Sequence, residues 1–309
     1  MKSNYKYLFN GDIAIINKHK KEKSALEMRS KGEKILHTVI ISILVFHCAT
    51  LFLPWVWTFL SALKESFEFS NGSPFALPQK WLFSNFITAF TLLKVGDTTF
   101  GGMIWNSVWY IVVHTAFAIF IPACTGYCLS KYQFRARNFI YSTAVLCMTM
   151  PIVGTMAAGF KLYYQLGIYD TPLLVVVRSM GGFGGTFLIY YGYFKNISWS
   201  YAEAVMMDGG GPFTIFFRIM IPQAMPILTT YAITNAISSW NDYMTFITYL
   251  PSWPNLATGL YEYQSNMIRS ANYPVYFAGS LISLIPTIAI FMAFSGRIMT
   301  SLSIGGLKG

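Results

Sequence analysis

Six long apolar stretches constrain the fold of this chain more than any other feature. A helix needs about 20 mostly apolar residues to cross a bilayer, and the hydrocarbon core admits only helices and closed barrels. The stretches lack the alternating pattern of a barrel strand. The sequence therefore predicts an all-α integral membrane protein with about six transmembrane helices. They cover residues 35–62, 103–129, 139–158, 173–194, 222–249 and 275–299.

Composition supports a membrane protein with two regions. Of the 309 residues, 54% are hydrophobic and only 11% are charged, which is too apolar for an ordinary soluble domain. We predict a basic N-terminal arm over residues 1–34 and a transmembrane domain over residues 35–309. The arm is too charged for a cleavable signal, and the first apolar stretch is too long for the core of one. That stretch is expected to remain as a membrane anchor.

The loop charges orient the predicted spans. The first 34 residues hold nine Lys or Arg against four acids, and residues 130–138 hold three basic residues and no acid. Sixteen of the 22 basic residues fall on one side of the predicted membrane, and the positive-inside rule places that side in the cytoplasm. Both termini and the loop 195–222 are therefore expected there. Topology and contact with anionic lipid account for the net charge of +10 without a nucleic-acid partner.

The loop 195–222 predicts two short helices joined by a bend. Ser200 and Glu203 have the spacing of a capping box, which favours a helix over residues 200–207. Three glycines follow at 209–211 and can take positive φ at no steric cost, so the chain is expected to turn there.

The second helix of this loop is expected to begin at Pro212 and to stop at Pro222. Its apolar residues recur at i, i+3, i+4 and i+7, which is a one-sided stripe. We expect this stripe to pack on the protein's own spans. It consists of Phe213, Phe216, Phe217 and Met220.

The loop resembles the EAA loop of permease subunits in binding-protein-dependent ATP-binding-cassette (ABC) importers. The family pattern is Glu-Ala-Ala, then Asp-Gly, then Ile-x-Leu-Pro, and this chain departs from it at Val205, at Ile221 and at Ser198, where Pro is frequent. The resemblance implies a type I importer permease fold with a cytosolic coupling helix-turn-helix that docks on a separate ATPase subunit. The coupling residues that it implies are Glu203, Ala204, Val205, Asp208, Gly209, Ile219 and Pro222.

Further segments are similar to the carbohydrate-uptake branch of this family, in particular to the second membrane subunit of the maltose/maltodextrin importer. The resemblance implies half of a sugar pathway in a bacterial cytoplasmic membrane. It also implies a second related permease, two ATPase subunits that bind ATP and Mg, and an extracytoplasmic sugar-binding protein. The segments are 167–171, 240–243, 258–260 and 305–309.

Polar residues on one face of the predicted fifth span indicate a substrate path, because polar groups within a bilayer normally face a protein interior or a wet cavity. At about 1.5 Å per residue, Asn235 lies roughly 20 Å from Pro222. Arg178 either snorkels outward, pairs with Asp170 or Asp242, or contacts substrate. The polar face holds Tyr231, Thr234, Asn235, Ser238 and Asp242.

Motifs for chemistry within this chain are missing from the sequence. There is no Gly-x-x-x-x-Gly-Lys-Ser/Thr phosphate loop, and the four histidines form no ligand set. We therefore expect a non-catalytic subunit with no cofactor or metal of its own. An ion-coupled secondary transporter is the alternative, but Asp242 is the one acid near a span interior and the chain has no evident internal repeat. Dependence on ATP or on an ion gradient separates the two.

Overall fold

The computed structural model describes residues 31–150, 154–270 and 272–306. Most of the predicted basic arm lies outside the described residues. The chain divides into two units, Met1–Thr58 and Phe59–Gly309, which are considered separately. In the first unit the described residues belong to helix α2 (Lys31–Ala62), whose segment Lys34–Ala62 is long and apolar enough to cross a membrane. This segment agrees with the first predicted span.

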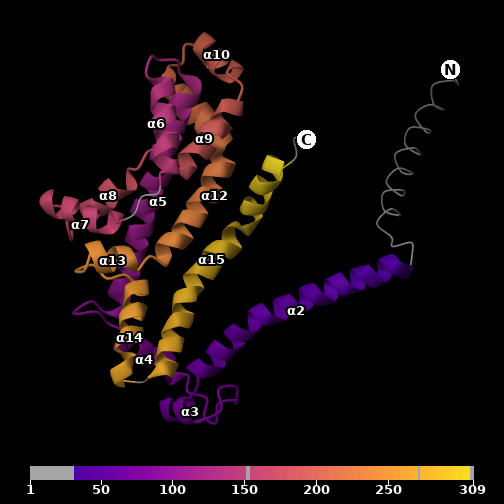
Figure 1. The fold of residues 1–309 in the computed structure, drawn as a ribbon, viewed down its shortest axis with the longest axis vertical. Coiled ribbons are helices and arrows are strands. Elements are labelled where there is room, and N and C mark those ends of the chain that lie inside the picture. Colours follow the sequence, from indigo (N-terminus) through magenta and orange to yellow (C-terminus); the bar gives the residue numbers. More distant parts are fainter. Residues whose placement is uncertain (1–30, 151–153, 271, 307–309) are drawn as a thin grey trace. The chain divides into compact units, whose positions relative to one another are not determined.

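The second unit is built from helices, and no strand occurs in the described ranges (Figure 1). The prediction of an all-α fold is confirmed. Its elements are α3 (Ser66–Asn71), α4 (Ser84–Leu92), α5 (Phe100–Lys131), α6 (Arg137–Thr149), α7 (Thr155–Gln165), α8 (Pro172–Ser179), α9 (Gly185–Asn196), α10 (Ser200–Met207), α11 (Pro212–Thr214), the π-helix η1 (Ile215–Met220), α12 (Ile221–Trp240), α13 (Met244–Tyr249), α14 (Leu256–Ser270) and α15 (Tyr273–Gly306).

Three predicted spans are interrupted where the sequence analysis expected single helices. The third is divided into α6 and α7, and α7 is preceded by Gly154 with φ of +80°. The fourth is divided into α8 and α9 by a segment rich in glycine, which is a poor helix former. The fifth ends early because α12 stops at Trp240 and α13 follows after a short break. Counting only single helices in the described residues, four are long and apolar enough to span a membrane.

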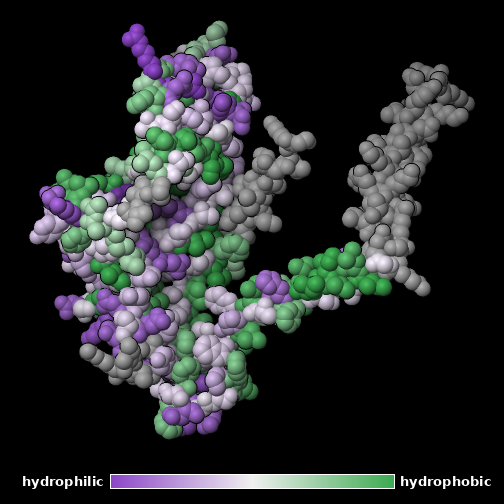
Figure 2. All heavy atoms as spheres, viewed as in Figure 1, coloured by the Kyte–Doolittle hydropathy of each residue, from purple (hydrophilic) through white to green (hydrophobic). Residues whose placement is uncertain are grey.

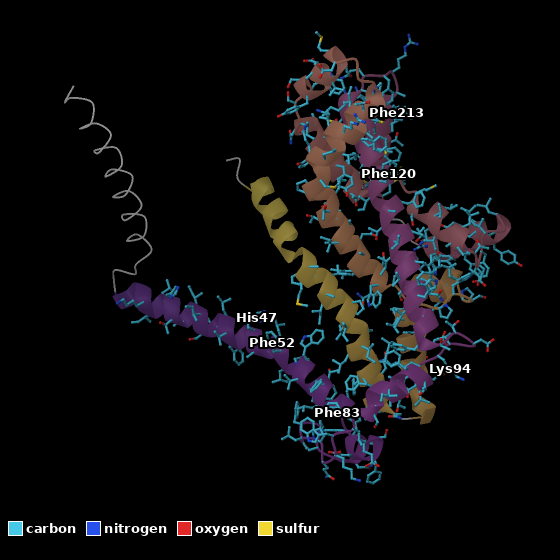
Figure 3. All side chains as sticks on the ribbon, turned by 180° about the vertical axis from the view of Figure 1, so that it is seen from behind. His47, Phe52, Phe83, Lys94, Phe120 and Phe213 are labelled. Carbon is cyan, nitrogen blue, oxygen red and sulfur yellow. The ribbon has the colours of Figure 1, made fainter. Side chains whose placement is uncertain are left out.

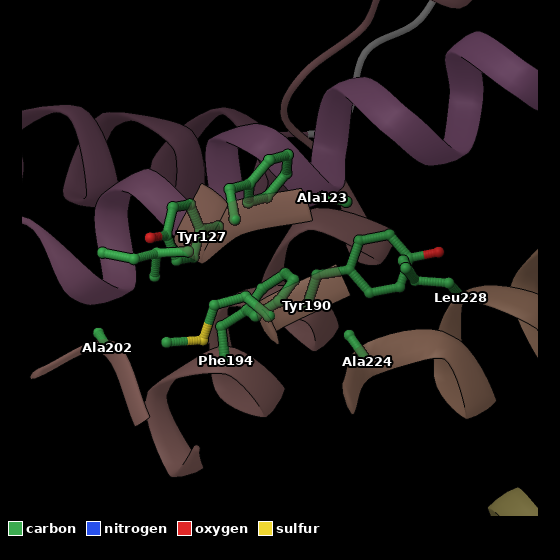
Figure 4. Close-up of a cluster of buried hydrophobic side chains, with 10 residues drawn as sticks. Ala123, Tyr127, Tyr190, Phe194, Ala202, Ala224 and Leu228 are labelled. Atoms are coloured by element: carbon green, nitrogen blue, oxygen red, sulfur yellow. The ribbon is translucent and has the colours of Figure 1, made fainter. Parts of the chain in front are cut away.

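The centre of the second unit is the packing of α5 against α9 and α12. Gly126 of α5 permits a close approach, since a Cβ atom there would lie 3.0 Å from the backbone nitrogen of Tyr191. Small residues at such contacts are typical of membrane helices. Around this crossing lies a cluster of buried side chains from α5, α9, α10, η1 and α12 (Figure 4). Its members include Ala123, Tyr127, Tyr190, Phe194, Ala202, Ala224 and Leu228.

The two ends of the second unit carry different short helices. Helix α10 lies at one end, while α3, α4 and α14 lie at the other (Figure 1). Hydrophilic residues gather over the α10 end and around α3 (Figure 2). This distribution is the one expected of helices that cross a bilayer and expose their ends to water.

Candidate coupling surface and polar helix face

Helix α10 has one anchored face and one exposed face. Ala202 is fully buried in the central cluster, and Val205 packs against the same cluster. Glu203 and Ala204 are exposed on the other face, and the side chain of Met207 is 88% exposed. Asp208, directly after the helix, is exposed as well. The helix is therefore held by the core and presents acidic and apolar groups outward.

The predicted capping box at the start of α10 is wrong. Ser200 is the first residue within the helix, and its hydroxyl oxygen lies 2.8 Å from that of Ser198. Trp199 occupies the cap position and its side chain makes no capping hydrogen bond, while the hydroxyl oxygen of Ser198 accepts one of 3.3 Å from the amide of Ser200. Because Ser200 already belongs to the helix, its hydroxyl does not accept a hydrogen bond from the free amide groups of the first turn. Glu203 is thus left exposed, without the internal partner that a capping box would give it.

The predicted bend after α10 is confirmed and has a specific geometry. The amide of Gly210 donates to the carbonyl of Val205 at 2.8 Å, and the amide of Gly209 donates to that of Met206 at 3.0 Å. This pair of bonds, with φ of +79° at Gly209, is a Schellman motif. A Cβ atom on Gly210 would lie 2.4 Å from Cγ1 of Val205. Both glycines are therefore required by the local geometry.

The prediction that Pro222 stops the second helix is wrong. Residues Pro212–Trp240 form one continuous helical segment of 29 residues. The π-helix η1 precedes the proline, and the amide of Ile221 bonds to the carbonyl of Phe216, five residues earlier. Proline lacks an amide hydrogen and clashes with the carbonyl four residues before it in an α-helix. The wider π turn avoids that conflict, so the helix passes through Pro222.

The π turn also changes which side chains face the core. Ile215, Phe216 and Met220 are buried, with Phe216 only 7% exposed. Phe213 is 81% exposed, so the predicted apolar stripe is wrong there, whereas Phe217 is 50% exposed but stacks on Phe120 of α5. A spacing of i, i+3, i+4 and i+7 places residues on one face only in an α-helix. The π-helix has wider turns, so residues on either side of it do not keep that common face.

Asn235 of the predicted polar face is turned toward α5. Its Oδ1 accepts a hydrogen bond of 3.0 Å from the hydroxyl of Thr115 and lies 3.1 Å from Nδ1 of His114. The same histidine nitrogen lies 3.1 Å from the hydroxyl of Ser239. These four polar side chains join α5 to α12.

Asp242 lies beyond the last turn of α12 and extends this network. Its Oδ2 accepts a hydrogen bond of 2.8 Å from the buried hydroxyl of Tyr110, and its Oδ1 accepts one of 3.1 Å from the amide of Thr245. The ring of Tyr110 stacks on His114 with 5.3 Å between ring centroids. Asn235 of α12 and Asp242 beyond its end thus both contact residues of α5.

The remaining members of the predicted face point elsewhere. Thr234 and Ser238 are exposed, and the hydroxyl of Thr234 donates to its own helix backbone. Tyr231 packs edge-on against Tyr190, with 5.7 Å between ring centroids. The face is therefore divided between an interface with α5 and an open side.

Arg178 contacts neither of the two acids that the sequence analysis offered as partners. Its guanidinium carbon lies 4.9 Å from the ring centroid of Tyr249, which is cation–π geometry. Asp170 instead accepts hydrogen bonds from the amide and hydroxyl of Ser252. Arg178 is exposed beside this ring.

Several residues of this network were missed by the sequence analysis. Tyr110 and His114 are two of them, and together with Asn106, which donates to the carbonyl of Pro254, they recur at i, i+4 and i+8 on one face of α5. A polar stripe inside an apolar helix is a signal of an interior surface, and it was present in the sequence. The other missed members are Thr115 and Ser239.

The arrangement of helices around a membrane core, with an exposed helical loop at one end, is that of a transport permease. Residues 118–299 match the family described as binding-protein-dependent transport system inner membrane component. Because the match covers more than half of the chain, the protein belongs to this family. The EAA-type resemblance in the sequence is thereby confirmed at the level of the family.

Proteins that are similar to this one over nearly its whole length are also transport permeases. The diacetylchitobiose uptake system permease of Streptomyces coelicolor is 26% identical over 271 residues, which are 86% of this chain and 87% of the relative. The arabinooligosaccharides transport system permease of Halalkalibacterium halodurans is 27% identical over 290 residues, 91% of this chain and 100% of the relative. The chain is a membrane-spanning permease subunit of an ABC importer.

A solved structure confirms the fold. One chain in the crystal structure of a bacterial ABC transporter that imports the acidic polysaccharide alginate aligns with a TM-score of 0.71 and 21% identity. The alignment covers 87% of this protein and 98% of that chain. A chain from the alginate transporter in complex with its pentasaccharide-bound periplasmic protein aligns with a TM-score of 0.59 and 15% identity. The predicted type I importer permease fold is therefore confirmed.

Proposed function

We propose that this chain forms half of a pathway for a sugar or oligosaccharide and transmits the action of a separate ATPase through α10. The named relatives carry different carbohydrates, a chitobiose derivative in one case and arabinooligosaccharides in another. They support carbohydrate as the substrate class. Asn235, Ser238 and Thr234 supply neutral hydrogen-bonding groups along α12, which suits the hydroxyl groups of a sugar.

The observation that carries the coupling proposal is the unbroken backbone from the α10 bend to the polar face. After Gly211 the helix begins at Pro212 and runs through η1 and α12 to Trp240. Asn235 lies on that same helix. A force on α10 would pass through the hydrogen-bonded turn at Gly209 and Gly210 into the one helix that carries Asn235, which suits a helix shift driven by an ATPase.

The assembly that we propose contains four kinds of chain. A second related permease completes the pathway, and two ATPase subunits bind ATP and Mg. An extracytoplasmic binding protein delivers the sugar, and this chain is a non-catalytic subunit. The α10 end and both termini face the cytoplasm of a bacterial cell, as the distribution of basic residues favours.

In the coupling role, ATPase contact is made by residues in and around α10. Glu203, Ala204, Asp208 and Gly209 are exposed and would meet the ATPase directly. Val205, which packs on the core, would position the helix. Ile219 and Pro222 lie in the continuous helix and would transmit the movement.

The matched pair Glu203→Lys and Glu65→Lys tests this proposal. Both glutamates are exposed, and they lie in and beside short helices at opposite ends of the second unit. We expect Glu203→Lys to lower the amount of ATPase that co-purifies with the chain by about tenfold, the effect of roughly 1.4 kcal/mol of binding free energy. Glu65→Lys is expected to leave it unchanged. An equal amount of ATPase with both variants would contradict the coupling role of α10.

A further inference from the structure

An apolar groove of about 460 Å³ runs between α5 and the start of the continuous helix. One wall is formed by Phe120, Cys124 and Cys128 of α5. The other is formed by Phe213, Phe216 and Phe217. Phe120 and Phe213 mark this region in Figure 3. Neither the coupling role nor the polar face uses this groove.

The groove has the length of one membrane leaflet. Its lining extends from Phe120 of α5 to Tyr132, the residue that follows this helix. Twelve residues of an α-helix cover about 18 Å. Half of a hydrocarbon core of about 30 Å is about 15 Å. The lined stretch is therefore about as long as the hydrocarbon half of one leaflet.

The size of the groove favours a thin, flexible occupant. A helix with its side chains is about 10 to 12 Å across, so a space of 460 Å³ holds only about one helical turn. The rings of Phe120 and Phe217 are nearly parallel, at 16°, with 6.2 Å between their centroids. Aromatic rings set in this way form flat sides, against which a hydrocarbon chain can lie.

The charges around the groove favour an anionic headgroup. Arg218 directly follows Phe217, and Arg135 lies three residues after Tyr132. Both arginines are exposed. Residues 101–169 and 209–241, which include both walls, contain no Asp or Glu. Each wall therefore has a basic residue within three positions of one of its lining residues.

We propose that this groove binds one acyl chain of an anionic phospholipid, whose phosphate lies near Arg218 and Arg135. The occupant would come from the leaflet on the α10 side. In this position the acyl chain sets the spacing between η1 and α5. The inference depends on the groove and its charges and does not depend on the transported substrate.

The test uses the purified importer in nanodiscs of phosphatidylcholine that contain a phosphatidylglycerol with a photoactivatable group in its acyl chain. After illumination, mass spectrometry maps the adducts. We expect adducts on residues 120–128 and 213–217. Unlabelled phosphatidylglycerol should suppress these adducts at least tenfold better than unlabelled phosphatidylcholine does. A tenfold difference in affinity is the scale expected when one lipid headgroup forms an additional ion pair. Adducts elsewhere on the chain with none in the groove would overturn the proposal and indicate that a protein partner covers it.

Two matched pairs of variants keep the proposal falsifiable. Cys128→Trp fills the groove, while Cys147→Trp makes the same change at an exposed site on α6. We expect the first to reduce the adducts about tenfold, which corresponds to displacing roughly two buried methylenes, and the second to leave them unchanged. Equal labelling of both would overturn the proposal.

The second pair tests the headgroup. Arg218→Gln should remove most of the preference for phosphatidylglycerol over phosphatidylcholine, while Lys195→Gln should retain it. Lys195 is a suitable control because it lies 5.9 Å from the ring centroid of Tyr191 on α9, and no lining residue is next to it in the sequence, whereas Arg218 directly follows Phe217. A preference that survives Arg218→Gln would contradict the assigned position of the phosphate.

Discussion

The hydroxyl of Tyr110 donates a hydrogen bond of 2.8 Å to the carboxylate of Asp242, and this contact joins α5 to the chain beyond α12. Tyr110 is buried and also stacks on His114, which lies 3.1 Å from Asn235. A movement of α12 along α5 would have to change both polar contacts together. The α5–α12 interface is therefore the part of the pathway that we expect to be most sensitive to substitution.

Tyr110→Phe tests the contribution of this hydrogen bond. Removing a donor to a charged group is expected to cost about 1.5 to 3 kcal/mol, so the melting temperature of the purified complex should fall. Tyr243→Phe is the matched control, because Tyr243 stacks on Tyr261 and its hydroxyl has no hydrogen-bond partner in the described chain. The same melting temperature for both variants would show that the Tyr110 contact contributes little.

Asn235 and Thr115 should act as one unit. Asn235→Ala and Thr115→Val each remove the same hydrogen bond, so the double variant should be less destabilised than the sum of the two. We expect a coupling of about 0.5 to 3 kcal/mol, as found for residues in direct contact. The measurement is thermal or denaturant unfolding of the four proteins in the cycle. Additive effects would mean that the two side chains are independent.

The bend after α10 offers a pair of neighbouring glycines with opposite expectations. Gly210→Ala places a Cβ atom 2.4 Å from Val205, while a Cβ on Gly211 meets nothing within 4 Å. Gly210→Ala should therefore displace α10 and reduce ATP-driven uptake, and Gly211→Ala should leave uptake unchanged. Uptake is measured at equal protein levels in the membrane. Equal uptake by both variants would contradict the importance of this turn.

The π-helix predicts different effects for two phenylalanines three residues apart. Phe216 is buried among residues of α5 and α9, so Phe216→Ala should cost about 3 to 5 kcal/mol of stability. Phe213 is 81% exposed, and Phe213→Ala should change stability by less than about 0.5 kcal/mol. Melting temperatures of the two variants provide the comparison. A larger loss for Phe213→Ala would favour the α-helical register over the π turn.

The fold class and the family could be predicted from the sequence because both depend on local features. Long apolar stretches indicate membrane helices, and the two halves of the coupling loop follow from glycine and proline positions. The extent of α10 and the positive φ of Gly209 agree with the prediction. These features depend on residues close together in the chain.

The parts that could not be predicted depend on residues far apart or on a change of helical period. The π turn before Pro222 cannot be read from a pattern that assumes 3.6 residues per turn, so the stripe at Phe213 and the stop at Pro222 were both wrong. The hydrogen bond between Thr115 and Asn235 joins residues 120 positions apart, and it depends on how α5 and α12 pack. The ring contact of Arg178 with Tyr249 has the same origin.

The central claim is that this chain is one permease half whose movement depends on a separate ATPase. The measurement that tests it most directly is purification from native membranes in mild detergent, with the associated chains identified by mass spectrometry. The account predicts an ATPase that carries a phosphate loop, together with a second membrane permease. A chain that purifies alone, with uptake that follows an ion gradient and persists without ATP, would contradict it.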